Sequence, residues 1–477
     1  MEFALIAVPL FMAALAALVQ SNRIRPWLLP VAAVAHACLT ATSLIHPELA
    51  SGSAWLKLDA LGRVVLPMVS LLFLFCSFYA VGVLHYRRNQ ANRVFCVCLI
   101  SFLSVMSLVS LSQHLGLLWV AIETTTLITA PLIYFNGTPQ SIEATWKYLL
   151  IGSVGIALAL LGTFFLAYAS LHQGIEPSLV IDDLLRNAPQ LSKPWLHAAF
   201  VLLLVGYGTK MGLAPMHTWK PDVYGEAPGV VGAIFAGGVT SCAFLALLRV
   251  YHICDAAGEG VYISRLLLLI GVLSMVVAGL FMVGQRDFKR MLAYSSVEHM
   301  GILAIGLSIG GPALFGTLLH VITNGLTKGV LFLSAGNIHR AYGSKSIDQV
   351  HGALRRLPYS GALFLAGFLA ITGSPPFGPF ISEFSILNGA FDAGRFATGG
   401  VFLLLLLVVF IGMGATVLPV VQGRTPAPSH GTPYREGMLT VMPVFFLMAL
   451  VLMLGLYLPT QLISLLNDAV LSLKVMP

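Results

Sequence analysis

Four ionisable side chains stand inside long apolar segments of this sequence. Glu123 directly follows the run Leu-Leu-Trp-Val-Ala-Ile, and Lys210 comes soon after Val-Leu-Leu-Leu-Val. Lys328 and Glu383 lie in similar surroundings further along the chain. A charge surrounded by apolar groups is costly, so such a residue usually has a function and a nearby partner. Because amines and carboxylates of this kind take up and release protons, the pattern indicates proton or cation transfer.

A short polar face accompanies one of the lysines. His320, Asn324 and Lys328 are spaced four residues apart and therefore share one face of a helix. Titratable and hydrogen-bonding groups on one face are typical of a wet path, and the alternative is a polar seam that joins neighbouring helices. The four charges favour the wet path, because charge is a costly way to join helices. His299 either belongs to the same path or is a hydrogen-bonded group near the start of its segment.

Two apolar segments are interrupted by glycine and proline beside a charged residue. The interruptions are Gly212 and Pro215 after Lys210, and Gly373, Pro375 and Pro376 before Glu383. A proline removes a backbone donor and frees a carbonyl of the preceding turn, and in lipid these groups need water or side chains. The breaks therefore predict hydrated cavities, with an ordinary proline kink as the alternative.

The composition shows what solvent surrounds these segments. Of the 477 residues 58% are hydrophobic and 9% are charged, against about 25% charged in a typical soluble domain. Continuous apolar runs long enough to cross the roughly 30 Å hydrocarbon layer recur along the whole chain, which excludes the alternating pattern of a β-barrel. We predict an all-α polytopic membrane protein of about fourteen transmembrane helices. The predicted spans are 3–20, 27–45, 63–84, 94–111, 114–135, 144–170, 196–216, 228–253, 262–284, 291–310, 312–336, 358–391, 400–422 and 439–464.

The interrupted spans are helices 7 and 12, and their spacing predicts an internal repeat. They are separated by an odd number of spans, so the two five-helix units around them (spans 4–8 and 9–13) have inverted topology. Interrupted helices at matching places of inverted repeats point to an ion site at mid-membrane. The predicted domains are N-terminal helices 1–3 (1–93), the first repeat (94–258), the second repeat (259–422) and C-terminal helix 14 (423–477).

The formal charge of +7 does not indicate nucleic acid, because the basic residues lie in short loops between spans. Loops after odd-numbered spans hold most of them, for example Arg23, Arg87, Lys220 and Arg286. Such a bias places these loops in the cytoplasm and predicts both termini on the outer face. The six cysteines form no CxxC pair, so we expect no metal or cluster site.

The residues around the first break resemble a known family. Thr209-Lys-Met-Gly-Leu-Ala-Pro-Met-His-Thr-Trp-Lys-Pro-Asp222 resembles the signature of the antiporter-like membrane subunits of respiratory complex I. The family includes Mrp-type cation/proton antiporters and the membrane arm of energy-converting hydrogenases. Two longer segments resemble further family motifs, and three short ones look most like component F of hydrogenase-4. These are 287–301 and 320–337, and then 122–126, 332–337 and 375–384.

The resemblance implies a role for each of the four charged residues. Glu123 is similar to the family glutamate that pairs with the lysine of span seven, which is Lys210 here. Lys328 is similar to the central relay lysine, and Glu383 to the terminal charged residue of the path.

One position departs from the family pattern. Several members have a lysine in span eight where this sequence has Ser241. We therefore expect the path between the first two lysines to run through water, Thr240, Ser241 or a histidine. His217 and Lys220 follow the first break, and we expect them near the cytoplasmic surface as weaker candidates for relay or access.

The resemblance implies a proton-translocating subunit of a redox-driven, complex I-like assembly of the hydrogenase-4 or formate hydrogenlyase type. The sequence contains no nucleotide motif, cluster motif or nucleophile arrangement, so we expect no cofactor in this chain and a driving reaction in partner membrane subunits. The alternatives are a Na⁺/H⁺ antiporter subunit of the Mrp type, a subunit of an NADH–quinone oxidoreductase, and a structural subunit that does not pump. We expect it in a bacterial or archaeal plasma (inner) membrane.

Overall fold

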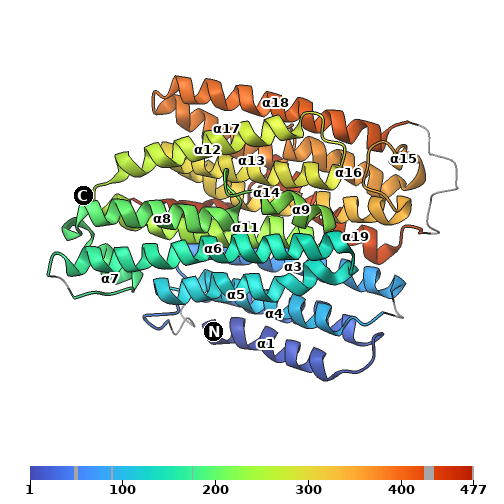
Figure 1. Ribbon diagram of the computed structural model, residues 1–477, viewed down its shortest axis with the longest axis horizontal. Helices are drawn as coiled ribbons and strands as arrows, with labels where there is room; N and C mark the ends of the chain where they lie inside the picture. The colour runs from blue at the N-terminus through green and yellow to red at the C-terminus, as the bar shows by residue number, and fades with distance from the viewer. Residues whose placement is uncertain (48–51, 88–89, 175, 424–433, 475–477) are drawn as a thin grey trace.

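The computed structural model describes residues 1–47, 52–87, 90–174, 176–423 and 434–474. Most of its helices lie side by side along the long axis of the molecule (Figure 1). The first six long helices are α1 (Glu2–Leu18), α2 (Leu28–Ile45), α3 (Ala60–Tyr86), α4 (Arg93–Leu111), α5 (Leu115–Ile133) and α6 (Pro139–Leu171). The remaining long helices are α8 (Lys193–Met211), α11 (Thr240–Ala256), α12 (Gly260–Met282), α13 (Phe288–Ile309), α14 (Ala313–Tyr342), α16 (Pro358–Ile371), α17 (Gly378–Asp392), α18 (Phe396–Val421), α19 (Met438–Leu456) and α20 (Thr460–Ser472).

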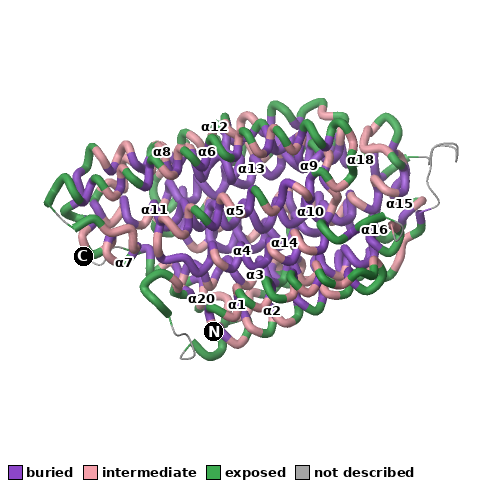
Figure 2. Tube along the Cα trace, turned by 60° about the horizontal axis from the view of Figure 1, so that its bottom comes forward, coloured by how far each residue is buried: buried purple, intermediate pink, exposed green. Residues whose placement is uncertain are grey.

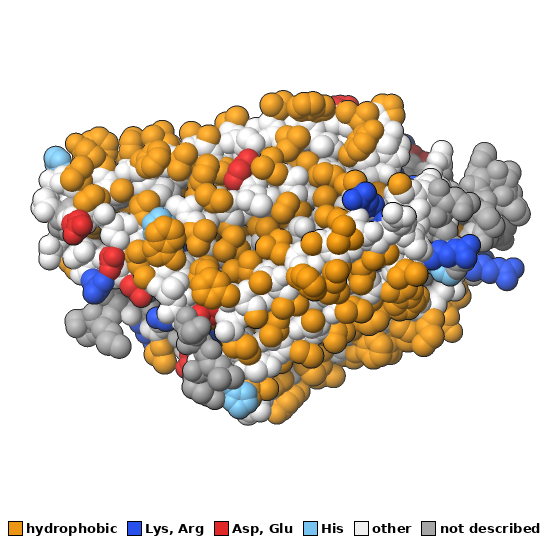
Figure 3. Space-filling view, turned by 90° about the horizontal axis from the view of Figure 1, so that it is seen from below, with side chains coloured by type: hydrophobic (Ala, Val, Ile, Leu, Met, Phe, Trp, Pro, Cys, Tyr) orange, Lys and Arg blue, Asp and Glu red, His pale blue; other side chains and the backbone are white. Residues whose placement is uncertain are grey.

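The helices have the length and composition of membrane spans. In the described residues, 11 helical segments are long and apolar enough to cross a membrane, and α1 and α16 are shorter apolar helices. On the face shown in Figure 3, hydrophobic side chains cover the middle and charged side chains gather mainly towards the two ends. Each predicted span falls on a helix or on a broken pair of helices, which confirms the polytopic all-α fold.

Both predicted breaks are present. The seventh span ends with α8 at Met211, and the chain resumes as the short helix α9 (Trp219–Glu226). The twelfth span is divided into α16 and α17. Each first half ends close to a glycine with positive φ, +74° at Gly212 and +67° at Gly373, a conformation that side chains other than glycine rarely adopt. The glycines therefore stop the helices, and a proline follows each of them shortly.

The eighth span differs from the continuous helix that we predicted. It consists of α10 (Gly229–Ile234), a π-helical segment (Phe235–Val239) and α11. Gly237 lies so close to α14 that an added Cβ would be 2.9 Å from the carbonyl oxygen of Gly325. Single π-helical turns inside α-helices are frequent at functional sites.

The centre of the molecule is formed by α11, α13 and α14. Most residues of α11, α13 and α14 are buried; Figure 2 shows this buried interior. Polar groups on these helices are thereby shielded from lipid.

The C-terminal span is shorter than we predicted. The last predicted span (439–464) ends earlier, because α19 stops at Leu456 and the separate helix α20 begins after Pro459.

In both halves the third helix of the predicted repeat packs on the broken helix, α6 on α8 and α14 on α16 and α17. The domain boundaries stay a prediction.

Candidate functional site

Glu123 and Lys210 are joined through a threonine hydroxyl. The Lys210 ammonium donates to Thr126 Oγ1, and Thr126 donates to Glu123 Oε2 at 3.2 Å. Ser153 donates to the other oxygen of Glu123 at 3.1 Å. Lys210 is 1% exposed, whereas Glu123 is half-buried. The pairing of Glu123 with Lys210 implied by the family therefore passes through Thr126, which sequence reasoning did not single out.

The Lys210 ammonium lies in a narrow space between α6 and α8. Its Nζ is 5.0 Å from the centre of the Tyr148 ring, an arrangement in which the ring face attracts the cation. A Cβ added to Gly152 would come within 3.0 Å of the same nitrogen. Glycine at this position leaves room for the ammonium and for small movements of it.

This space leads to a prediction for Gly152→Ala. The added methyl group would push Lys210 away from Thr126, and we expect a severalfold loss of proton translocation with normal assembly, because small displacements of a reacting group are costly. The matched control is Gly400→Ala, since nothing lies within 4 Å of a Cβ at that helical glycine. Equal proton translocation by the two variants would show that the space around Lys210 is not critical.

Lys220 is placed differently from our expectation. We predicted it near the cytoplasmic surface, but its side chain is 0% exposed. The reason is Gly212, because the Lys220 stem lies where a Cβ at Gly212 would stand, 2.3 Å from Cε. The ammonium donates to the hydroxyl of Ser296 at 3.0 Å and to the Ser296 carbonyl at 3.4 Å. The break thus lets a lysine from α9 reach α13 inside the protein.

Lys328 reaches the same helix from the other side. Its Nζ donates to the Ser295 hydroxyl at 2.6 Å and interacts electrostatically with Glu298. Glu298 is 1% exposed, and we did not single it out from the sequence. The criterion that identified the other four charges would have found it, since it lies within the span predicted at 291–310, near its start.

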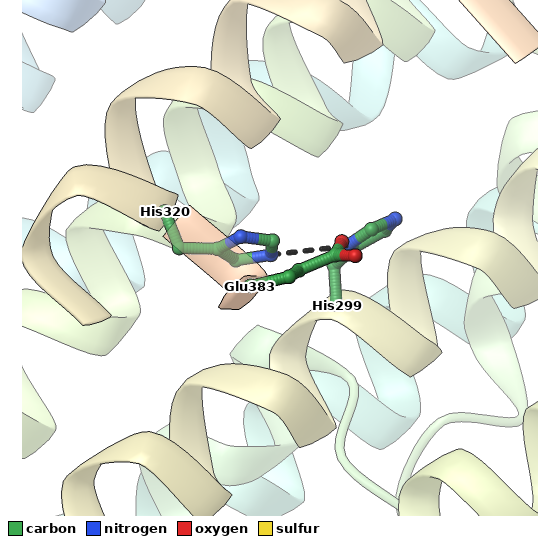
Figure 4. A group of neighbouring side chains, drawn as sticks. All are labelled: His299, His320 and Glu383. Carbon is green, nitrogen blue, oxygen red and sulfur yellow. Dashed lines mark hydrogen bonds and ion pairs between the residues drawn. The ribbon is translucent and has the colours of Figure 1, made fainter. Parts of the chain in front are cut away.

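Beyond Glu298, two histidines lead to Glu383. His299 Nε2 is 3.8 Å from Glu298 Oε2, and its Nδ1 is 3.0 Å from His320 Nε2. His299 Nδ1 is also 4.0 Å from Glu383 Oε1, and Figure 4 shows the three side chains facing one another. The other nitrogen of His320 is 2.9 Å from the Ser382 hydroxyl. The structure therefore brings His299, His320 and Glu383 together, and a role for them in a wet path stays a prediction.

The same group has the donor set of a cation site. The ligand atoms of His299, His320 and Glu383 lie within 4.8 Å of one another, and two imidazoles with a carboxylate suit several divalent metals. However, the Lys328 ammonium interacts electrostatically with both histidines. A positive charge on Lys328 disfavours a metal cation in this cluster.

Several of the predicted relay or access groups are buried without direct contact to this series. Thr240 donates to the Ala236 carbonyl at 2.7 Å. Among the described residues, Ser241 Oγ, both amide atoms of Asn324 and Nδ1 of His217 have no hydrogen-bond partner. Buried polar groups are normally satisfied by protein or ordered water. We therefore expect water beside these groups, with His217 lying inside the surface rather than on it (8% exposed).

Comparison with known proteins identifies the family. The family described as NADH:quinone oxidoreductase/Mrp antiporter, TM, matches residues 112–414, which is well over half of the sequence. This chain belongs to that family. The resemblance predicted from the motifs is thereby confirmed.

Individual relatives agree with this assignment. A hydrogenase-4 component F homolog from Methylacidiphilum infernorum (isolate V4) is 35% identical over 364 residues, covering 75% of each chain. A chain of respiratory complex I from Thermus thermophilus is 28% identical, with a TM-score of 0.77 over 96% of this chain and 97% of that one. A chain of the membrane-bound sulfane sulfur reductase, an archaeal respiratory membrane complex, has a TM-score of 0.88 at 20% identity, over 99% of this chain and 97% of that one. The chain is thus an antiporter-like, multi-pass membrane subunit.

Proposed function

We propose that this chain is a proton-translocating subunit of a redox-driven membrane complex of the hydrogenase-4 type. The observation that carries the proposal is a set of titratable groups gathered in the interior of this membrane protein. It contains Glu123, Lys210, Lys220, Lys328, Glu298, His299, His320 and Glu383. Such groups inside a membrane protein are costly and mark ion paths.

The chemistry follows from desolvation. A lysine that is removed from water tends to lose its proton, and a nearby carboxylate favours keeping it. A change in the separation of Glu123 and Lys210 therefore changes whether Lys210 holds a proton. Lys210 loads from the cytoplasmic side, the proton passes laterally to Lys328, and Glu383 governs its release to the outer side.

Partner subunits supply the driving force in this proposal. The similarity to hydrogenase-4 component F and to chains of respiratory membrane complexes supports an assembly with other membrane subunits. Their redox reaction alters the surroundings of Glu123, which is half-buried and bonded to the exposed Ser153. The redox cofactors belong to those partners.

Proton pumping by the purified, reconstituted complex tests the proposal. In Lys210→Ala and Glu123→Gln we expect electron transfer to continue while proton translocation slows by about 100-fold or more, since a positioned proton-transfer group contributes roughly 10²–10⁴-fold. The control is Glu143→Gln, because Glu143 lies at the surface in a pair with Lys147, where such pairs contribute little. Normal pumping in both variants would refute the proposal, and pumping that requires sodium would favour an Mrp-type exchanger.

A further inference from the structure

The step between Lys210 and Lys328 is where this chain departs from the family pattern. The groups expected from the sequence, Thr240 and Ser241, do not contact either lysine directly. The Thr240 hydroxyl is used within its own helix, and the Ser241 hydroxyl has no partner among the described residues. Another group must connect the two ammoniums, or the path is interrupted.

Lys220 and Lys328 bind the same stretch of α13. Its ammonium donates to the hydroxyl of Ser296, while that of Lys328 donates to the hydroxyl of Ser295, the preceding residue of α13. The two lysines interact electrostatically, so their ammoniums face the same short stretch of one helix. The two lysines therefore lie at one place on α13, where a proton can pass between their surroundings.

Towards Lys210, two buried tyrosines fill the gap. The Tyr148 ring centre is 5.0 Å from the Lys210 nitrogen, and the Tyr224 ring centre is 5.8 Å from the Lys220 nitrogen. The two phenol groups lie close enough to interact electrostatically, and the Tyr224 hydroxyl lies near the hydroxyl of Ser296. The Tyr224 hydroxyl has no hydrogen bond of good geometry among the described residues, so it is free to turn. The rings of Trp219 and Phe235 pack against both tyrosines, so the proposed transfer between the two tyrosine hydroxyls requires a bridging water molecule.

The simpler explanation is that Lys220 has a structural role and that its hydrogen bonds hold α9 against α13, as a clip would. A clip does not require a charge, and a buried ammonium without a carboxylate is costly. In the described part of the chain, Lys220 makes no ion pair. The groups around it are hydroxyls, the cation Lys328 and the imidazoles of His217 and His299. Such surroundings suit an amine that is neutral part of the time better than a permanent clip.

We infer that Lys220 is the relay residue between Lys210 and Lys328, the role that the family resemblance assigns to a lysine at the position of Ser241 here. The inference rests on the proposed proton-translocating function. Each transfer moves one proton: the Lys210 ammonium becomes a neutral amine as Lys220 becomes an ammonium, and Lys220 then returns to the amine as Lys328 is protonated. The intervening hydroxyls each accept one proton and donate one, so no charge remains on them.

Pumping by the complete complex after substitution of Lys220 tests the inference. In Lys220→Met we expect normal electron transfer and about a 100-fold slower proton transfer, the lower end of the roughly 10²–10⁴-fold range for a positioned proton-transfer group. Ser241→Ala and Thr240→Val should pump normally. In Lys220→Met/Ser241→Lys, a lysine restored at the position used by relatives should recover pumping.

The variant Lys220→Arg distinguishes proton transfer by Lys220 from a purely structural role. Arginine keeps the positive charge and can donate to Ser296, but it does not release its proton in proteins. A relay predicts that the arginine variant assembles and pumps no better than Lys220→Met, and this comparison also decides the matter if the methionine variant fails to assemble. Normal pumping by the arginine or the methionine variant, or loss of pumping in Ser241→Ala, would overturn the inference.

The two proposals can fail separately. If Lys210→Ala stops pumping and Lys220→Met does not, only the role of Lys220 is wrong. If both variants pump normally, the proposed proton-translocating function is wrong as well.

Discussion

Replacing Lys328 with methionine is expected to abolish proton translocation by this subunit. In the proposed path a proton reaches the second repeat through the Lys328 nitrogen, which is bonded to Ser295 and interacts electrostatically with Lys220 and Glu298. Methionine fills a similar volume but cannot carry a proton. The measurement is the acidification of proteoliposomes per electron transferred, and we expect no signal from this subunit above the leak.

Two controls protect this result from a trivial explanation. Lys193→Met removes an exposed lysine that pairs with Glu259, so it reports the effect of losing a surface charge, which is small. Glu298 is buried and interacts electrostatically with Lys328, so Lys328→Met also removes a favourable positive charge from the surroundings of this carboxylate. The double variant Lys328→Met/Glu298→Gln removes both charges and should assemble at least as well as the single variant. Pumping by either Lys328 variant would contradict the prediction.

Glu383→Gln is expected to have an equally large effect for a different reason. Glutamine keeps the size and the polar contacts of Glu383 but cannot take up or release a proton. The carboxylate lies at the twelfth-span break, where a Cβ at Gly373 would be 2.2 Å from Oε2, and its Oε1 faces His299. We expect proton release to stop while Lys210 and Lys328 remain able to exchange protons within the protein.

Pumping and proton uptake together check the Glu383 prediction. The variant should lose net translocation across the membrane, yet still show proton uptake from the cytoplasmic side in a single turnover. Asp392→Asn provides the control, because Asp392 is an exposed carboxylate at the end of the same helix α17. If Glu383→Gln translocates normally, release takes place through another group and the assignment of Glu383 fails.

The spans, the breaks and the four charges could be predicted from the sequence because each depends on local chemistry. An apolar run of sufficient length predicts a membrane helix wherever it occurs. A glycine followed by prolines stops a helix with little regard to its surroundings, as at Gly212 and Gly373. The sharing of one face by His320, Asn324 and Lys328 follows from helical spacing alone.

The positions of Lys220 and the shape of the eighth span could not be predicted in this way. Lys220 lies just after a break in a polar segment, a pattern that fits a surface loop equally well. Its burial depends on how α9 turns back against α13 past a glycine, which is a tertiary effect. The π-helical turn before Thr240 similarly depends on the close approach of Gly237 to the backbone of α14. Glu298 is different, since the sequence already contained the signal for it.

Thr126, which lies between Glu123 and Lys210, has only one hydrogen to donate, and this restricts how it can connect them. Thr126 has a single hydroxyl hydrogen, which points to Glu123 while its oxygen accepts from Lys210. An ammonium has no lone pair, so this direction is enforced as long as Lys210 is charged. Once Lys210 is a free amine it can accept, and the hydroxyl can rotate to it and leave the Glu123 oxygen bare. The direction of the Thr126 O–H bond thus depends on the charge of Lys210 and changes the hydrogen bonding of Glu123. Neither Lys210 nor Glu123 has to move for this.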